Sequence, residues 1–115
     1  MLRKYDYVGC CLCFAKKLMA IAVIGGYKLN KKDAVKTVEF YRFQTRKWTL
    51  LPELQNARYS ASSCCHGSYI YVFVGKDNAG KEINTIERIH LDYQDNWELI
   101  QPKRYWGHQV LPRTN

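Results

Sequence analysis

Two apolar runs of this chain end in glycine and recur at a fixed distance: Ile21-Ala22-Val23-Ile24-Gly25-Gly26 and Ile70-Tyr71-Val72-Phe73-Val74-Gly75. Their last glycines lie 49 residues apart (75 − 26), and Trp48 and Trp97 are separated by the same 49 residues (97 − 48). Because two independent landmarks share one period, the chain contains an internal repeat. A repeat of about 50 residues that contains short apolar strands predicts one small β-sheet in each copy.

The segment after the first run carries a motif of specific residues. A polar loop leads to Val38-Glu39-Phe40-Tyr41-Arg42-Phe43-Gln44-Thr45-Arg46-Lys47-Trp48, and Leu51-Pro52 and Arg58 follow. The Val-Glu-x-Tyr start and the step of seven residues from Tyr41 to Trp48 (48 − 41) resemble the kelch motif. The chain is therefore similar to kelch-repeat β-propellers, and this resemblance implies one four-stranded sheet, or blade, per repeat.

The second copy of the motif is looser than the first. Ile86-Glu87-Arg88-Ile89 has isoleucine in place of the tyrosine, and one extra residue precedes Trp97. Pro102-Lys103-Arg104-Tyr105 then repeats Asn56-Ala57-Arg58-Tyr59, so a third copy begins near the C-terminus. We expect an all-β chain without an internal domain boundary, organised as blade 1 at about 1–54, blade 2 at about 55–101 and the start of a third repeat at 102–115.

The resemblance implies four antiparallel strands in each blade. The expected strands lie near 6–14, 20–26, 36–42 and 47–51, and near 60–66, 69–75, 84–91 and 96–100. Turns are expected at Lys16-Lys17, Thr45-Arg46, Gly67-Ser68 and Asp95-Asn96, and the longest loops at 27–35 and 76–83. Trp48 and Trp97 should occupy equivalent, largely buried positions, because large aromatic rings suit the space between packed sheets.

The length of the chain predicts an incomplete ring. A propeller closes with about four to eight blades, whereas this sequence holds two and part of a third. Either the sequence is a piece of a larger propeller, or it completes a ring with other copies. We favour the first alternative, because the third repeat stops in mid-strand. Self-association is expected in both cases, since two blades leave apolar sheet faces uncovered.

Charge and hydrophobicity limit the kinds of partner. The net charge is +8 and the pI about 9.3, which favours acidic partners or polyanions. The basic residues are scattered, a pattern more typical of a solvated surface than of a nucleic-acid track. Lys16-Lys17 divides the hydrophobic stretch 8–26 into two strand-length pieces, too short for a membrane-spanning helix. We therefore expect no targeting segment and a cytoplasmic, intracellular location.

Five cysteines fall in two clusters, Cys10-Cys11-x-Cys13 and Cys64-Cys65. On a strand, Cys11 and Cys13 share one face and Cys10 points to the other, so this cluster alone cannot offer three converging thiolates. We expect reduced, buried thiols that act as small hydrophobic groups, with metal binding or redox sensing as the alternative. The sequence predicts no metal site and no cofactor.

The ionisable residues form no catalytic pattern. His66, His90 and His108 lie far apart in the sequence, and the carboxylates do not occur in pairs. Some kelch propellers are oxidases or sugar-processing enzymes, but their sites collect residues from several blades of a closed ring. We therefore expect that the chain is not an enzyme, with a fragment of a larger kelch-type enzyme as the alternative.

The resemblance implies a scaffold for protein–protein interaction that binds a partner through its loops. The partner is a protein of unknown identity, expected to be acidic; no small-molecule substrate is evident, and a basic nucleic-acid-binding surface is a further alternative. The candidate contact residues lie in the two long loops. They are Tyr27, Lys28, Lys31, Lys32, Lys76, Asp77, Asn78 and Lys81.

Overall fold

The computed structural model describes residues 5–15, 18–93 and 95–100. These residues form ten β-strands and no helix, so the all-β prediction is confirmed for them. In this part of the chain, then, no helix is long and apolar enough to cross a membrane. The expected turn at Lys16-Lys17, His108 and the expected third repeat at 102–115 lie outside the described residues.

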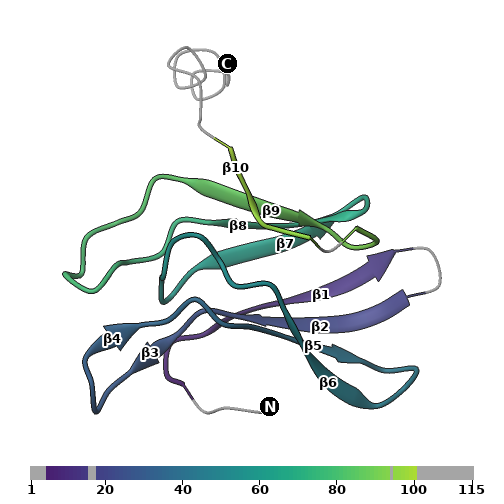
Figure 1. Cartoon of the computed structure of the whole chain (residues 1–115), viewed down its shortest axis with the longest axis horizontal. Helices are drawn as coiled ribbons and strands as arrows, with labels where there is room; N and C mark the ends of the chain where they lie inside the picture. The colour runs from purple at the N-terminus through teal and green to yellow at the C-terminus, as the bar shows by residue number, and fades with distance from the viewer. Residues whose placement is uncertain (1–4, 16–17, 94, 101–115) are drawn as a thin grey trace, which may run out of the picture.

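The first half of the chain forms a four-stranded antiparallel sheet, which we call the N-sheet, with the strand order β1-β2-β5-β6 (Figure 1). Its strands are β1 (Gly9–Ala15), β2 (Leu18–Ile24), β5 (Val38–Arg42) and β6 (Lys47–Leu51). A small hairpin of β3 (Tyr27–Lys28) and β4 (Asp33–Ala34) lies between β2 and β5 in the sequence. This hairpin occupies a segment that the sequence predicted to be an irregular loop.

The second half forms a four-stranded antiparallel sheet, the C-sheet, with the order β10-β9-β8-β7. Its strands are β7 (Ser62–His66), β8 (Tyr69–Phe73), β9 (Ile86–His90) and β10 (Glu98–Ile100). All eight expected strands are present, with ends within three residues of the expected bounds. Trp97 was expected within the strand at 96–100, but β10 begins one residue after it.

Strand pairing repeats with the period of the sequence. Val23 pairs with Glu39 in the N-sheet, and Val72 pairs with Glu87 in the C-sheet. The two valines lie 49 residues apart (72 − 23) but the two glutamates 48 (87 − 39), because the second loop is one residue shorter. The extra residue before Trp97 compensates for the shorter loop, so Trp48 and Trp97 are again 49 residues apart (97 − 48). The internal repeat of the sequence is thus a repeat of structure.

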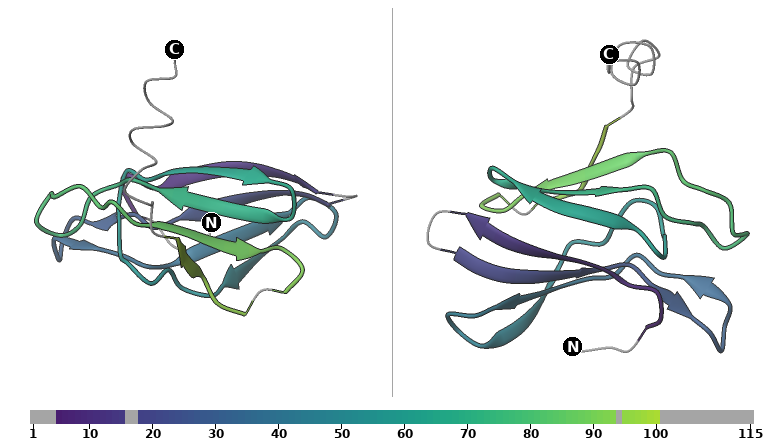
Figure 2. Two further views of the ribbon diagram at one scale, coloured as in Figure 1. Left: turned by 90° about the horizontal axis from the view of Figure 1, so that it is seen from above. Right: turned by 180° about the vertical axis from the view of Figure 1, so that it is seen from behind.

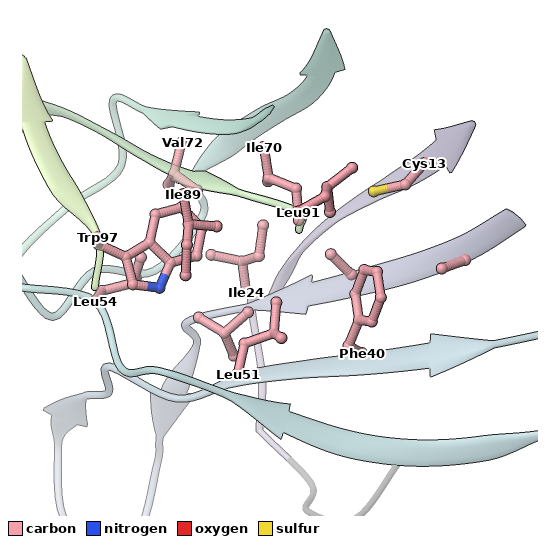
Figure 3. Close-up of a cluster of buried hydrophobic side chains, with 13 residues drawn as sticks. Cys13, Ile24, Phe40, Leu51, Leu54, Ile70, Val72, Ile89, Leu91 and Trp97 are labelled. Carbon is pink, nitrogen blue, oxygen red and sulfur yellow. The ribbon is translucent and has the colours of Figure 1, made fainter. Parts of the chain in front are cut away.

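The two sheets pack face to face, and the hydrophobic core lies between them (Figures 1 and 2). Side chains alternate along each strand, so one face of each sheet points inward. The N-sheet contributes Ile24, Phe40 and Leu51 to the core, and the C-sheet contributes Ile70 and Val72 (Figure 3). Each sheet therefore also has an outer face, which points away from the other sheet.

The two sheets face the same way, so the inner face of the C-sheet corresponds in the repeat to the outer face of the N-sheet. Trp97 lies in the core, 1% exposed, and its indole Nε1–H donates to the carbonyl oxygen of Pro52 at 2.7 Å. Trp48 pairs with Tyr41, whose strand neighbour Phe40 points into the core, so Trp48 lies on the outer face of the N-sheet. The burial prediction therefore holds for Trp97 and only in part for Trp48, which is half-buried.

The cysteines only partly follow the expectation of buried thiols. All five are free, and Cys13 is buried, while Cys11 and Cys65 are half-buried. Cys10 and Cys64 are exposed, because strand alternation turns them to the outer faces of the two sheets. His66 ends β7, within the expected strand 60–66, and is exposed.

Candidate functional site

Three connections of the chain meet at one end of the stacked sheets, which we call the loop end. They are residues 27–37 with the β3–β4 hairpin, the linker 52–57 between the sheets, and the loop 76–83. Two shallow hollows open there and share Lys36 and Ala57 in their linings. The two long loops that the sequence singled out therefore belong to one surface.

Asn78 joins the two loops directly. Its amide Nδ2–H donates to Asp33 Oδ1 at 3.2 Å, and its Oδ1 accepts the backbone N–H of Ala34. Both bonds run from the 76–83 loop to β4, across 45 and 44 residues of sequence. The sequence predicted Asn78 as a contact residue but did not predict that it holds the hairpin.

Asp77 shapes its own loop. Its side-chain Oδ1 accepts hydrogen bonds from the backbone N–H groups of Ala79 at 2.9 Å and Lys81 at 3.0 Å. Its backbone carbonyl oxygen accepts a hydrogen bond from the backbone N–H of Gly80 at 3.0 Å. A carboxylate that caps a turn in this way fixes the backbone of the loop. Gly80 has φ = +77°, a left-handed conformation that glycine adopts without strain. The loop is thus a built turn and holds Lys81 in a set position.

A buried ion pair fixes the linker beneath the hollows. The Arg58 guanidinium Nη2 lies 2.9 Å from Glu87 Oε2, and both side chains are 0% exposed. The Glu87 carboxylate also accepts the backbone N–H of Gln55 at 2.7 Å and of Asn56 at 3.0 Å. Burial lowers the pKa of Arg58, and the charge of Glu87 opposes this effect. Glu87 of the C-sheet therefore orders two residues of the linker.

Arg58 also holds the ends of the second loop. Its Nη1–H groups donate to the carbonyl oxygens of Val74 at 2.9 Å and Thr85 at 3.0 Å, on either side of the 76–83 loop. The first repeat needs glycine nearby, since a Cβ on Gly25 would lie 2.3 Å from the Arg58 carbonyl oxygen. One arginine thus contacts both loops, by its side chain and by its backbone.

The hollows have mixed linings with several polar groups. The larger, of about 480 Å³, is lined by Lys36, Asp77 and the amide-bearing residues Gln55, Asn56 and Asn78, together with Ala57, Ala79 and Ile83. The smaller, of about 320 Å³, is lined by Tyr5, Lys28, Glu53 and Ala57 and by residues 33–37. Such linings suit hydrogen bonds to a polar chain segment better than the burial of an apolar ligand.

The expected contact residues differ in how they are presented. Lys31, Lys32, Lys76 and Lys81 are exposed. Tyr27 is half-buried and stacks on Tyr59 with 4.9 Å between ring centroids, so it supports the hairpin. Lys28 is also half-buried, with its Nζ 5.8 Å from the centroid of the Tyr5 ring.

The positive charge of the loop end is concentrated on one side. Residues 27–36 hold four lysines and one aspartate, a net charge of +3 (4 − 1). Residues 76–83 hold two lysines, Asp77 and Glu82, which balance to zero (2 − 2). An acidic partner would therefore be attracted mainly to the β3–β4 side.

The sequence did not predict Gln55 and Asn56, which lie outside the two loops where contacts were expected. Lys36 ends the first of these loops, 27–36, but was not singled out as a contact residue. The only available signal was the polar composition of the linker itself.

Within the described residues, His, Cys, Asp and Glu form no group of three arranged to hold a metal ion. No model of a known protein family matches this chain.

Proposed function

We propose that the chain is a protein-interaction module made of two kelch-type blades, which binds an acidic protein segment at the loop end. The observation that carries the proposal is the bridge from Asn78 to Asp33 and Ala34. It unites two loops from different sheets into one surface. The kelch assignment is supported by the motif residues, by the shared strand order and by the repeated pairing of valine with glutamate.

The loop end has the properties that recognition of a protein segment requires. The Arg58–Glu87 pair and the two sheets hold the loops in place, so little ordering is needed on binding. Exposed Lys31 and Lys32 offer charge to carboxylates, and the hollow beside Lys36 offers amide groups. An extended, acidic segment fits both features.

A binding titration tests the proposal. A fluorescently labelled peptide rich in aspartate and glutamate is titrated with the chain, and its anisotropy is followed. Lys31→Ala with Lys32→Ala should weaken binding by roughly three- to tenfold, since exposed ion pairs contribute modestly. The control is Lys47→Ala, which removes one exposed lysine at the start of β6, on the far side of the N-sheet from the hairpin.

Two further outcomes of this titration would contradict the proposal. The loop variant removes two charges and the Lys47 variant one, so a free-energy loss in the Lys47 variant half as large as that in the loop variant would mean that the peptide responds only to net charge. Tighter binding to a DNA duplex than to the peptide, with a steep decrease as salt rises, would favour the nucleic-acid alternative. Asn78→Ala, which leaves every lysine in place, should also weaken peptide binding if the bridge forms the surface.

A further inference from the structure

The edge strands β1 and β7 lie side by side where the two sheets meet (Figures 1 and 2). β1 is an edge strand of the N-sheet and β7 is an edge strand of the C-sheet. Their backbones approach closely, since a Cβ on Gly9 would lie 2.8 Å from the carbonyl oxygen of Ala61. Glycine at this position thus permits the contact between the strands.

The contacts between β1 and β7 follow one register. Gly9 lies against Ala61, the Cys11 sulfur lies beside the Ser63 hydroxyl, and the Cys13 thiol contacts the Cys65 thiol. Each pair is separated by 52 residues (61 − 9, 63 − 11, 65 − 13). The strands therefore run in the same direction, and the register places Cys13 opposite Cys65.

Cysteines of both sheets line this seam, with Cys13 between Cys11 and Cys65. Cys13 is 0% exposed, and Cys11 and Cys65 pack against the buried cluster to which it belongs, with the thiols of both near its own. Cys11 and Cys65 are half-buried, so both are partly accessible to solvent while Cys13 is not. Sequence reasoning excluded three converging thiols within the first cluster. The structure instead places Cys65, from the second cluster, beside Cys13.

We propose that Cys13 and Cys65 form a thiol–disulfide exchange site, which a low-molecular-weight disulfide such as glutathione disulfide oxidises to a bond between the sheets. Cys11 cannot take the place of Cys65 as the partner of Cys13. Residues two apart on an extended strand have Cβ atoms about 6 to 7 Å apart, whereas a disulfide needs about 3.5 to 4.5 Å.

The reaction proceeds by two exchanges. The Cys65 thiolate attacks one sulfur of the external disulfide, one external thiol leaves, and a mixed disulfide forms on Cys65. The Cys13 sulfur then attacks the Cys65 sulfur, and the second external thiol leaves. In sum, the two protein thiols lose two electrons and two protons, and the external disulfide becomes two thiols.

Cys11 assists the second exchange by accepting a proton. The neighbouring Cys13 thiol lowers the pKa of Cys11 to about 7, and the nearby Ser63 hydroxyl lowers it further, although burial opposes them. The buried Ser63 hydroxyl makes no hydrogen bond with the described residues. The same contact with Cys11 raises the pKa of Cys13. Near neutral pH the Cys11 thiolate therefore receives the Cys13 proton as Cys13 attacks.

The experiment treats the folded, full chain with glutathione disulfide, blocks remaining thiols, digests with trypsin without reduction and identifies linked peptides by mass. Trypsin leaves Cys10, Cys11 and Cys13 on one peptide, residues 5–16, and both remaining cysteines on another, residues 59–76. The wild-type chain should give a linked 5–16/59–76 pair that lacks two hydrogens. Substitutions then assign the two sulfurs.

Serine variants decide between the cysteines. Cys64→Ser and Cys10→Ser, at exposed positions, should keep the link, while Cys65→Ser and Cys13→Ser should lose it. Cys11→Ser should give the same linked pair several-fold more slowly at neutral pH. A link that survives in Cys65→Ser, or is lost in Cys64→Ser, would overturn the assignment. So would a wild-type chain that carries glutathione only on its exposed thiols.

A second measurement separates exchange from loss of folding. Because Cys13 is buried, its serine variant could fail to fold, so the wild-type chain is also melted before and after oxidation. A bond that closes a loop of 52 residues (65 − 13) should raise the melting temperature by at least about 5 °C. An unchanged or lower melting temperature after complete oxidation would contradict the proposed pairing.

Discussion

Arg58 and Glu87 form a fully buried ion pair between the linker and the C-sheet, with 2.9 Å between Nη2 and Oε2. Their other hydrogen bonds go to backbone groups of Gln55, Asn56, Val74 and Thr85 and to the Thr85 hydroxyl. The pair therefore connects the two loops, the linker and β9. A single change at this pair should affect the whole loop end.

Glu87→Gln should lower the free energy of unfolding by about 3 kcal/mol, because Arg58 would stay buried without its counter-charge. Arg58→Met should cost a similar amount. The double variant should be more stable than the sum of the two losses predicts, though less stable than wild type, since backbone groups lose partners. Urea denaturation measures all three. A Glu87→Gln protein within about 0.5 kcal/mol of wild type would contradict this role.

Val74→Gly should stabilise the protein by about 1 kcal/mol. Val74 has φ = +54°, a left-handed conformation that strains a β-branched residue, and its counterpart in the first repeat is Gly25 with φ = +66°. The side chain is largely exposed, so little packing is lost. Val74→Ala keeps the strain and is the control. Thermal melting should show a gain for glycine only, and equal melting temperatures would refute the strain.

The two repeat tryptophans should differ in their effect on stability. Trp97→Ala removes a buried ring and its bond to Pro52, so it should cost about 3–5 kcal/mol. Trp48→Ala, on the outer face of the N-sheet, should cost about 1–2 kcal/mol. Chemical denaturation of both variants measures the difference. Equal losses would mean that something covers the outer face of the N-sheet as fully as the C-sheet covers its inner face.

The outer face of the N-sheet should mediate self-association. Leu12 on β1 points away from the core and is 49% exposed, beside the half-buried Ile21 with which it pairs. Exposed apolar faces of this kind promote association. Sedimentation velocity should show association that Leu12→Glu reduces. Leu29→Glu, at a 58% exposed loop position, makes the same change elsewhere and should leave association unaltered. A wild-type monomer at micromolar concentration would refute the prediction.

The repeat was readable from sequence because its landmarks are backbone requirements and large core side chains. Gly26 and Gly75 have φ values of +129° and +101°, which favour glycine, and Trp97 fills the space between the sheets, so these positions constrain residue type. The β3–β4 hairpin was missed because two-residue strands carry no periodic signal. Nor does the sequence show that Asn78 meets Asp33 or that Cys65 meets Cys13. These contacts depend on how the sheets stack, which no local pattern encodes.

The outer position of Trp48 was missed for a related reason. The motif makes Trp48 and Trp97 equivalent, although Trp48 lies in β6 and Trp97 directly precedes β10. Equivalent positions are equally buried only where each sheet has a neighbour on the same side. The C-sheet has the N-sheet there, whereas no described residue forms a further sheet over the N-sheet. Burial in a stacked repeat is thus a property of the neighbouring sheet as well as of the motif.

The most direct test of the proposed binding surface is an NMR titration of the isotope-labelled chain with the acidic peptide. The account predicts that amide shifts change in residues 27–37, 55–57 and 76–83 together, and that Asn78→Ala separates the two loop responses. The turn at 43–46, at the opposite end of the N-sheet, should not respond. Shift changes centred on that turn or on the outer sheet faces, with the loop end unchanged, would contradict the account.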